Sequence, residues 1–473
     1  MIEGLKPYSD YGSVVSPWVG RIPSHWTVRK LRTLVSPRNQ RNRPDLPLLS
    51  VARERGVFVR GPDDGNRNVI PDDLSHYKVV RLGGLVINKM KAWQGSMGIA
   101  PCDGIVSPAY FVYDFRVANR EYGQALLRSR PYVAHFAQAS DGVRIGQWDL
   151  SVSDMREIPI VLPPPDEQAK IVRFLRYANW RIDRLIGAKK KLVALANEQK
   201  QSIIHHAVTR GLDARGEPIT RSTGERPVAY AQRRIPWLAS VPERWEMVPS
   251  GQLFQPRKEL AREGDEQLSS TQAYGVIPQA EFERRVGRRV VKISIHLEKR
   301  RHVDRDDFVI SMRSFQGGLE RAWASGCIRS SYIVLRPRAP IDVGYFAYLF
   351  KSPEYIRALQ ATANFIRDGQ DLNFDNFRLV DLPLPPTNEQ RAIAAYLDVH
   401  TSALTQSIDR MRRELQLLDE FRARITADVV TGQLDVRAVA AALPPEGEPA
   451  MDVEEPGGWL DSDDDDGQEG DDA

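Results

Sequence analysis

The 473-residue chain is too long for a single compact core, and its 42% hydrophobic and 27% charged residues are typical of a globular protein. It contains no apolar run of about eighteen residues that could span a bilayer, and its N-terminal segment lacks the pattern of a signal peptide. Cys102 and Cys327 are too few for a disulfide framework. We therefore expect about two to four domains in a cytoplasmic protein.

The net charge of +4 combines two unequal parts of the chain. Residues Glu446–Ala473 contain 13 acidic and no basic residues. The first 445 residues therefore contain the other 49 of the 62 acidic residues and all 66 basic residues, which gives them a net charge of +17. Such a basic body favours a polyanionic partner, with a merely soluble basic protein as the alternative. We expect residues 436–473 to form an acidic, disordered tail, and mimicry of nucleic acid by this tail is a secondary possibility.

The sequence is repeated in two units. Pro17–Trp26 (PWVGRIPSHW) matches Pro236–Trp245 (PWLASVPERW) at an offset of 219 residues, and LPPPDEQ at Leu162–Gln168 matches LPPTNEQ at Leu384–Gln390 at an offset of 222. Between and after these motifs the remaining matches keep the offset of 222: Gln94-Gly95 with Gln316-Gly317, and VTRGLD (Val208–Asp213) with VTGQLD (Val430–Asp435). A drift of three residues is what loop insertions produce, so we predict an internal duplication.

Each unit begins with a mixed segment, residues 1–162 in the first and 236–384 in the second. Short apolar runs such as 84–88 and 308–310 predict strands, since Gly, Pro and Asp separate them. Helical stretches such as 121–128 interrupt these runs. We interpret both segments as globular α/β domains, with residues 211–235 as the linker that precedes the second.

Each unit then ends in a predicted long helix, within residues 163–210 and 385–435. Prolines end the strand region, and Asp166 and Asn388 are suited to cap the helices. Apolar residues follow at the 3.5-residue spacing of a coiled coil: Ile171, Leu175, Ala178, Ile182, Leu185, Leu192 and Ala196 in the first helix, and Ile393, Leu397, Leu404, Ile408, Met411, Leu415, Leu418 and Ile425 in the second. Helices of about 65 Å with one narrow stripe are unstable alone, so we predict that they pair, antiparallel.

Taken together, the repeated W-x-x-x-x-P-x-x-W motif and the LPPPDEQ and LPPTNEQ motifs before helices ending in VTxxxD resemble the DNA-specificity subunits of type I restriction–modification systems. The resemblance covers roughly residues 15–437 and excludes the acidic tail. It implies that each domain is a target-recognition domain that reads one half of an interrupted DNA site. It also implies that the helices separate the domains and dock two modification subunits, which methylate adenine, while restriction subunits join for cleavage.

Catalytic motifs are missing from the sequence. It has neither a phosphate-binding G-x-x-x-x-G-K-[ST] loop nor the Asn/Asp-Pro-Pro-Tyr/Phe motif of an adenine methyltransferase, and its eight histidines show no metal-ligand spacing. We therefore expect a non-catalytic chain without metal or cofactor, whose partner subunits hold S-adenosylmethionine, ATP and Mg²⁺. A fused nuclease or methyltransferase and a protein-binding coiled-coil adaptor are the rival hypotheses.

Two loops in each domain are candidates for DNA contact, because Lys and Arg bind phosphate or guanine and Gln can pair with adenine. The first loop follows a predicted strand at Asn88–Gly95 and, in the second domain, at Ser311–Gly317. The second loop lies at 142–147 and 366–370. The candidates are Lys89, Lys91, Gln94, Arg144 and Gln147 in the first domain, and Arg313, Gln316, Arg367 and Gln370 in the second. We expect Trp93 and Phe315 to support their loops from the core.

Overall fold

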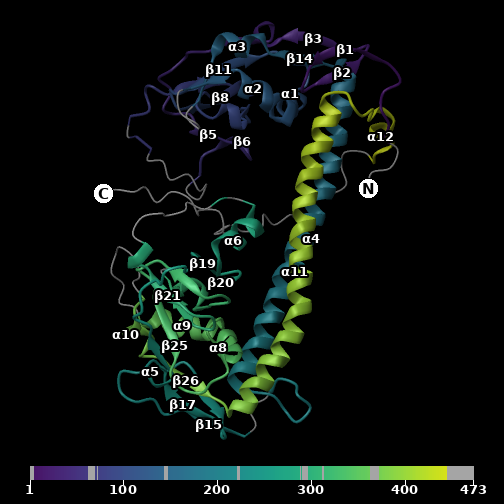
Figure 1. Cartoon of the computed structure of the whole chain (residues 1–473). Coiled ribbons are helices and arrows are strands. Elements are labelled where there is room, and N and C mark those ends of the chain that lie inside the picture. The colour runs from purple at the N-terminus through teal and green to yellow at the C-terminus, as the bar shows by residue number, and fades with distance from the viewer. Residues whose placement is uncertain are drawn as a thin grey trace. The chain divides into compact units, whose positions relative to one another are not determined.

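The computed structural model describes residues 5–61, 70–71, 73–142, 148–220, 224–287, 289, 297–311, 314–362 and 372–444 (Figure 1). The chain divides into two compact units, Met1–Ile186 with Gln416–Ala473, and Gly187–Leu415. The long helices α4 (Pro165–Arg210) and α11 (Thr387–Val430) contribute to both units. In the described part of the chain, no helix is both long and apolar enough to cross a bilayer.

The first unit combines short strands with small helices. Its strands are β1 (Tyr11–Ser16), β2 (Gly20–Pro23), β3 (Thr27–Lys30), β4 (Val35–Pro37), β5 (Leu49–Ala52), β6 (Gly56–Val59), β7 (Lys78–Val80), β8 (Leu85–Asn88), β9 (Met97–Ile99), β10 (Gly104–Val106), β11 (Tyr110–Phe115), β12 (Ser140–Asp141), β13 (Asp149–Leu150) and β14 (Pro159–Leu162). Its helices are η1 (Leu31–Thr33), η2 (Ala92–Gln94), α1 (Arg120–Arg128), α2 (Arg130–Gln138), α3 (Val152–Glu157) and, after α11, α12 (Arg437–Ala442).

The second unit has the same character. Its strands are β15 (Glu225–Pro227), β16 (Ser240–Pro242), β17 (Glu246–Pro249), β18 (Phe254–Pro256), β19 (Leu268–Thr271), β20 (Gly275–Pro278), β21 (Arg301–Val303), β22 (Phe308–Ile310), β23 (Glu320–Arg321), β24 (Gly326–Ile328), β25 (Ile333–Pro337) and β26 (Asp381–Leu384). Its helices are α5 (Ser250–Leu253), α6 (Gln279–Val286), η3 (Leu297–Lys299), α7 (Ser314–Gly317), α8 (Val343–Leu349), α9 (Pro353–Ala361) and α10 (Phe374–Phe377).

The two units share one sheet topology. A four-stranded antiparallel sheet has the order β4-β11-β8-β9 in the first unit and β18-β25-β22-β23 in the second. The surrounding two-stranded sheets also correspond, such as β14-β3 with β26-β17 and β5-β6 with β19-β20. The prediction of a mixed fold with two α/β domains and two long helices is therefore confirmed.

The repeated motifs have a structural role that explains their residues. Gln168 is buried; its Oε1 accepts from the backbone N–H of Asn119 (3.0 Å) and its Nε2 donates to the carbonyl of Pro163 (2.9 Å). Gln390 makes the same two bonds in the second unit, with Asp342 (2.8 Å) and Pro385 (2.8 Å). The glutamine of LPPPDEQ and that of LPPTNEQ thus each join the start of a long helix to the start of α1 or α8, respectively.

In the first unit, the glutamate of LPPPDEQ also contacts the second tryptophan of the W-x-x-x-x-P-x-x-W motif. The Trp26 indole donates to Glu167 (3.1 Å), which also accepts from the Tyr8 hydroxyl (2.6 Å). In the second unit Glu389 instead pairs with Arg244, beside the buried Trp245. In the first unit the two motifs therefore close the domain onto its helix by buried polar contacts that satisfy one another, whereas the buried Trp245 indole N–H of the second unit has no hydrogen-bond partner among the described residues.

The long helices pair in antiparallel orientation. Within the second unit Lys189 contacts Glu414 and Lys200 donates to Thr405 (2.8 Å), so residue numbers rise along one helix as they fall along the other. Within the first unit Asp183 pairs with Arg422. The predicted helix pair is confirmed, although its helices begin at Pro165 and Thr387, so that the predicted caps lie inside the first turn.

The apolar seam differs from the predicted stripe in its middle. Ile171, Leu175, Ala178 and Ile182 are buried as expected, but Leu185 and Leu192 are 49% and 54% exposed. The half-buried positions at this level are Ile186, Lys189 and Val193. At this level the residues that face the other helix come one position later in the sequence than the strict 4-3 spacing predicts. Lys189 fits among them because its aliphatic stem packs in the seam while its ammonium pairs with Glu414.

Each unit completes its core with the end of the helix that begins in the other. Val429 and Val430 at the end of α11 belong to the core of the first unit, where the Tyr122 hydroxyl donates to the Val430 carbonyl (3.1 Å). In the second unit the Tyr345 hydroxyl donates to the carbonyl of Val208, at the end of α4 (2.9 Å).

The start of the expected tail is folded. We expected disorder from residue 436, but residues 437–442 form α12, and Val436 and Ala440 are buried in the core of the first unit. The backbone of Asp435 also bridges to Lys6 near the N-terminus. These apolar contacts lie before the acidic run, which begins in the segment 445–473 outside the described residues.

Candidate nucleic-acid interface

The loop after β8 presents part of the predicted contact set. Lys91 is exposed, and Lys89 and Gln94 are half-buried. The chain turns through the short helix η2, which ends at Gly95 with a φ of 89°, a conformation that favours glycine. The buried strand β8 therefore delivers two cations and an amide to one surface loop.

The first predicted loop of the first unit contacts residues 148–150, which follow the second predicted loop in the chain. Lys89 pairs with Asp149 (3.0 Å), and its carbonyl accepts from the backbone N–H of Leu150 (2.9 Å). Trp93 packs against Trp148 with ring centroids 5.1 Å apart, so it supports the loop as expected, although it is only half-buried. Residues 143–147, with the candidates Arg144 and Gln147, lie outside the described residues.

In the second unit, one predicted residue can be placed. Gln316 is exposed on α7, whereas Arg313, Arg367 and Gln370 lie outside the described residues, as does the side chain of Phe315. Lys351 holds the end of this loop, since its ammonium donates to the carbonyl of Gly317 (2.8 Å) and pairs with Glu320. Burial raises the pKa of Glu320 to about 7, against the opposing effect of Lys351.

The register of the strands corrects the sequence match between these loops. Ile87 pairs with Phe111, and Ile310 pairs with Ile333, so β8 corresponds to β22 at an offset of 223 residues. The following strands β9 and β23 return to an offset of 222. The second loop is one residue shorter, and the glycine with a left-handed φ there is Gly318 (75°), the neighbour of the matched Gly317.

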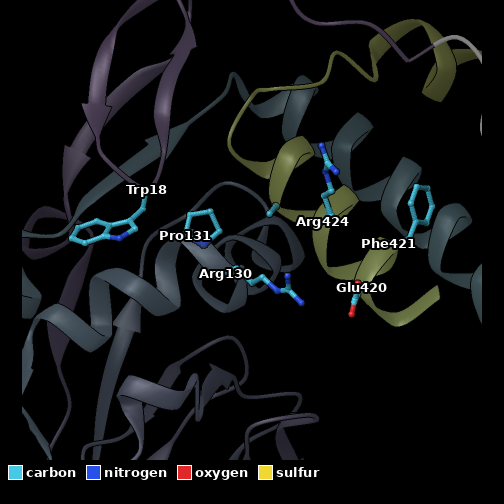
Figure 2. Close-up of a pocket in the computed structure, with 7 residues that line it drawn as sticks. Trp18, Arg130, Pro131, Glu420, Phe421 and Arg424 are labelled. Carbon is cyan, nitrogen blue, oxygen red and sulfur yellow. The ribbon is translucent and has the colours of Figure 1, made fainter. Parts of the chain in front are cut away.

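A groove of about 640 Å³ lies elsewhere in the first unit (Figure 2). Trp18, Arg130 and Pro131 line one side, and Glu420 and Arg424 of α11 line the other. At the matching position of the second unit His205 and Glu354 form an ion pair (2.8 Å). The groove shares no residue with the predicted loops, so we do not assign it to base reading. Among the described residues, no three His, Cys, Asp or Glu side chains gather as metal ligands would.

Comparisons with known proteins agree with this architecture. No family model matches the chain. It is 19% identical over 450 residues to a putative type I restriction enzyme MjaX specificity subunit of Methanocaldococcus jannaschii, covering 89% of this chain and 96% of that protein. It is 35% identical over 104 residues to the EcoKI specificity subunit of Escherichia coli, covering 21% and 22% of the two chains.

A solved structure shares the fold. A chain from a study of complex assembly and conformational transition of the type I R-M system superposes with a TM-score of 0.57 at 16% identity, covering 86% of this chain and 98% of the other. The solved structure therefore shares the fold over most of this chain. In sequence, the chain is similar to type I restriction enzyme specificity subunits, over most of its length in one relative and over about a fifth in the other.

Proposed function

We propose that the chain is the sequence-specific DNA-binding subunit of a type I restriction–modification complex, with each unit reading one half of an interrupted site. The observation that carries this proposal is the repetition of one framework with different surface loops. The same sheet order recurs, yet the loop after β8 carries two cations, Lys89 and Lys91, where the sequence of the loop after β22 (311–317) has one, Arg313. A net charge of +17 before the tail supports a polyanionic partner.

The predicted loops have chemistry suited to duplex DNA. Lys91 is exposed, and its ammonium makes no hydrogen bond or ion pair with another described residue, so this group is available for phosphate or guanine. Lys89 is tied to Asp149, so we assign it to positioning the loop beside its neighbour rather than to reading a base. Gln94 and Gln316 each bring an amide that can pair with adenine.

The helix pair also offers surface to protein partners. Large apolar side chains are exposed on the helices in both units: Trp180, Leu185, Leu417 and Phe421 in the first, and Leu192, Leu195 and Val399 in the second. Exposed apolar patches on helices are typical of protein interfaces. We therefore propose two docking sites for modification subunits, one in each unit. Restriction subunits would then join the complex through the modification subunits.

In this proposal the chain itself has no catalytic role. Methylation of adenine and cleavage belong to the partner subunits, which would hold S-adenosylmethionine, ATP and Mg²⁺. A mass measurement of the co-expressed complex should give two modification subunits for each chain. Leu185→Glu and Leu192→Glu should each lower that number, whereas a complex with one modification subunit in the unaltered protein would contradict the duplicated docking sites.

Methylated adenines in cellular DNA provide the decisive test. Cells with the chain and its modification subunits should carry a bipartite methylated motif that cells without the chain lack. The rival hypothesis of a coiled-coil adaptor predicts no such difference. It also predicts no binding of the purified chain to duplex DNA, whereas phosphate-driven binding weakens steeply as salt rises.

A further inference from the structure

Each unit carries a hairpin with the same backbone and a different turn. Strands β5 and β6 enclose residues 53–55, and β19 and β20 enclose residues 272–274. The turns are closed by Gly56 and Gly275, which have φ values of 73° and 72°. A three-residue turn followed by a left-handed glycine is a common hairpin form. The duplicated framework thus presents three side chains on one backbone, and their chemistry differs between the units.

The turn of the first unit is basic and held rigidly. Arg53, Glu54 and Arg55 are all exposed. Arg128 of α1 donates from Nη2 to the carbonyls of Arg53 (2.8 Å) and Glu54, which fixes the backbone of the turn. The guanidinium of Arg55 lies 4.1 Å from the ring centroid of Phe58 on β6.

The turn of the second unit carries an amide and an aromatic ring. Gln272, Ala273 and Tyr274 are exposed, and the hydroxyl of Thr271 accepts from the Tyr274 N–H (3.0 Å). Trp323, 46% exposed, adjoins the turn, because a Cβ on Gly275 would lie 2.9 Å from its Nε1.

The second turn also adjoins a predicted DNA loop. A Cβ built on Gly317 would lie 2.7 Å from Cδ of Gln272, so the turn and the end of α7 share one surface. That helix carries the exposed candidate Gln316. The hairpin turn and the predicted loop are therefore parts of the same contact region in this unit.

We propose that the turns 53–55 and 272–274 are base-reading elements, an inference that rests on the proposed function and was not reached from the sequence. Two domains that read different half-sites must differ in side chain where their backbones agree. A two-stranded ribbon fits the major groove, where Arg pairs with guanine O6 and N7 and Gln with adenine N6 and N7. Arg53 or Arg55 reads a guanine in the first half-site, and Gln272 reads an adenine in the second.

A turn graft in the full chain tests this inference. The triple variant Arg53→Gln, Glu54→Ala and Arg55→Tyr places the second turn on the first unit, and the variant is expressed with its modification subunits. Sequencing of methylated DNA should show altered bases in the first half-site alone, with the second half-site and the spacer unchanged. One of the single variants Arg53→Ala and Arg55→Ala should relax the preference for one guanine by about 5- to 150-fold.

Matched controls separate the possible failures. Arg29→Ala removes the same charge from an exposed position of β3 and should leave both half-sites unchanged. An unchanged first half-site in the graft and in both single variants, or a change in both half-sites, overturns the inference while the proposed function stands. A wild-type complex without any sequence preference overturns the proposed function instead. If the graft does not fold, the single variants at exposed positions still decide the question.

Discussion

Replacing Gly318 with alanine should destabilise the second unit strongly. Gly318 has a φ of 75°, and a Cβ there would lie 1.9 Å from the carbonyl oxygen of Phe350, a backbone atom at the end of α8. The left-handed backbone costs an L-residue about 1–2 kcal/mol, and displacement of packed neighbours costs about 1–3 kcal/mol more. The free energy of unfolding should therefore fall by about 2–5 kcal/mol.

The adjacent glycine is the matched control. A Cβ on Gly317 would meet the far end of the Gln272 side chain, which can move, and a helical Gly→Ala change gains up to about 1 kcal/mol. Gly317→Ala should thus stay within about 1 kcal/mol of the unaltered protein. The contrast matters because the sequence match selects Gly317 as the partner of Gly95, whereas the left-handed backbone conformation selects Gly318.

Scanning calorimetry of the full chain measures the difference. For a unit of this size, about 2–4 °C is lost for each kcal/mol, so Gly318→Ala should lower the melting temperature of the second unit by roughly 4–20 °C. Two units need not unfold in one step, so hydrogen exchange in peptides from 308–335 assigns the transition. Equal losses for the two variants, or an unchanged melting temperature for Gly318→Ala, would refute the argument.

Three further predictions concern the second unit, the half-sites and the helices. Burial raises the pKa of Glu320 to about 7 from 4.5, so the folded unit binds a proton that the unfolded chain releases, and stability from this group falls as pH rises between those values. Glu320→Gln should flatten that slope in urea titrations at pH 5 and 8. Exchanging residues 236–384 for those of a relative should change one half of the methylated motif; a change in both halves would contradict independent reading. Matched four-residue insertions near Ala188 and Arg410 should lengthen the spacer by about one or two base pairs, and an unchanged spacer would argue against a rigid helix pair.

The sequence predicts best where the chain repeats a strong local pattern. The duplication, the long helices and their antiparallel pairing follow from matched motifs and apolar spacing, because both signals accumulate over many residues. The middle of the seam does not follow, since Leu185 looks as apolar as Ile186 and only the packed pair shows which of them faces α11. Helix spacing alone is therefore too coarse to resolve a shift of one residue.

The surface loops show a second limit. Gln94-Gly95 and Gln316-Gly317 are identical in sequence, but the second of the two loops that contain them is one residue shorter. Only the pairing of β8 and β22 with their neighbouring strands reveals this deletion. The hairpin turns were missed for the opposite reason. Arg53 and Gln272 are unlike residues, so their equivalence is visible only through the common backbone of the two turns. A search for matching three-residue gaps before a glycine could have found them.

The exchange of helix ends between the units has a consequence for the chain's ancestry. Val430 completes the core that contains Tyr122, and Val208 completes the core that contains Tyr345, so no single cut in the backbone yields a finished unit. A half-length chain would have a core that lacks one helix end, and its own helix would end without a core to pack against. Two such half-chains would fill each other's places, so the repeated sequence and the exchanged helix ends are what joining two copies of one half-length chain would produce.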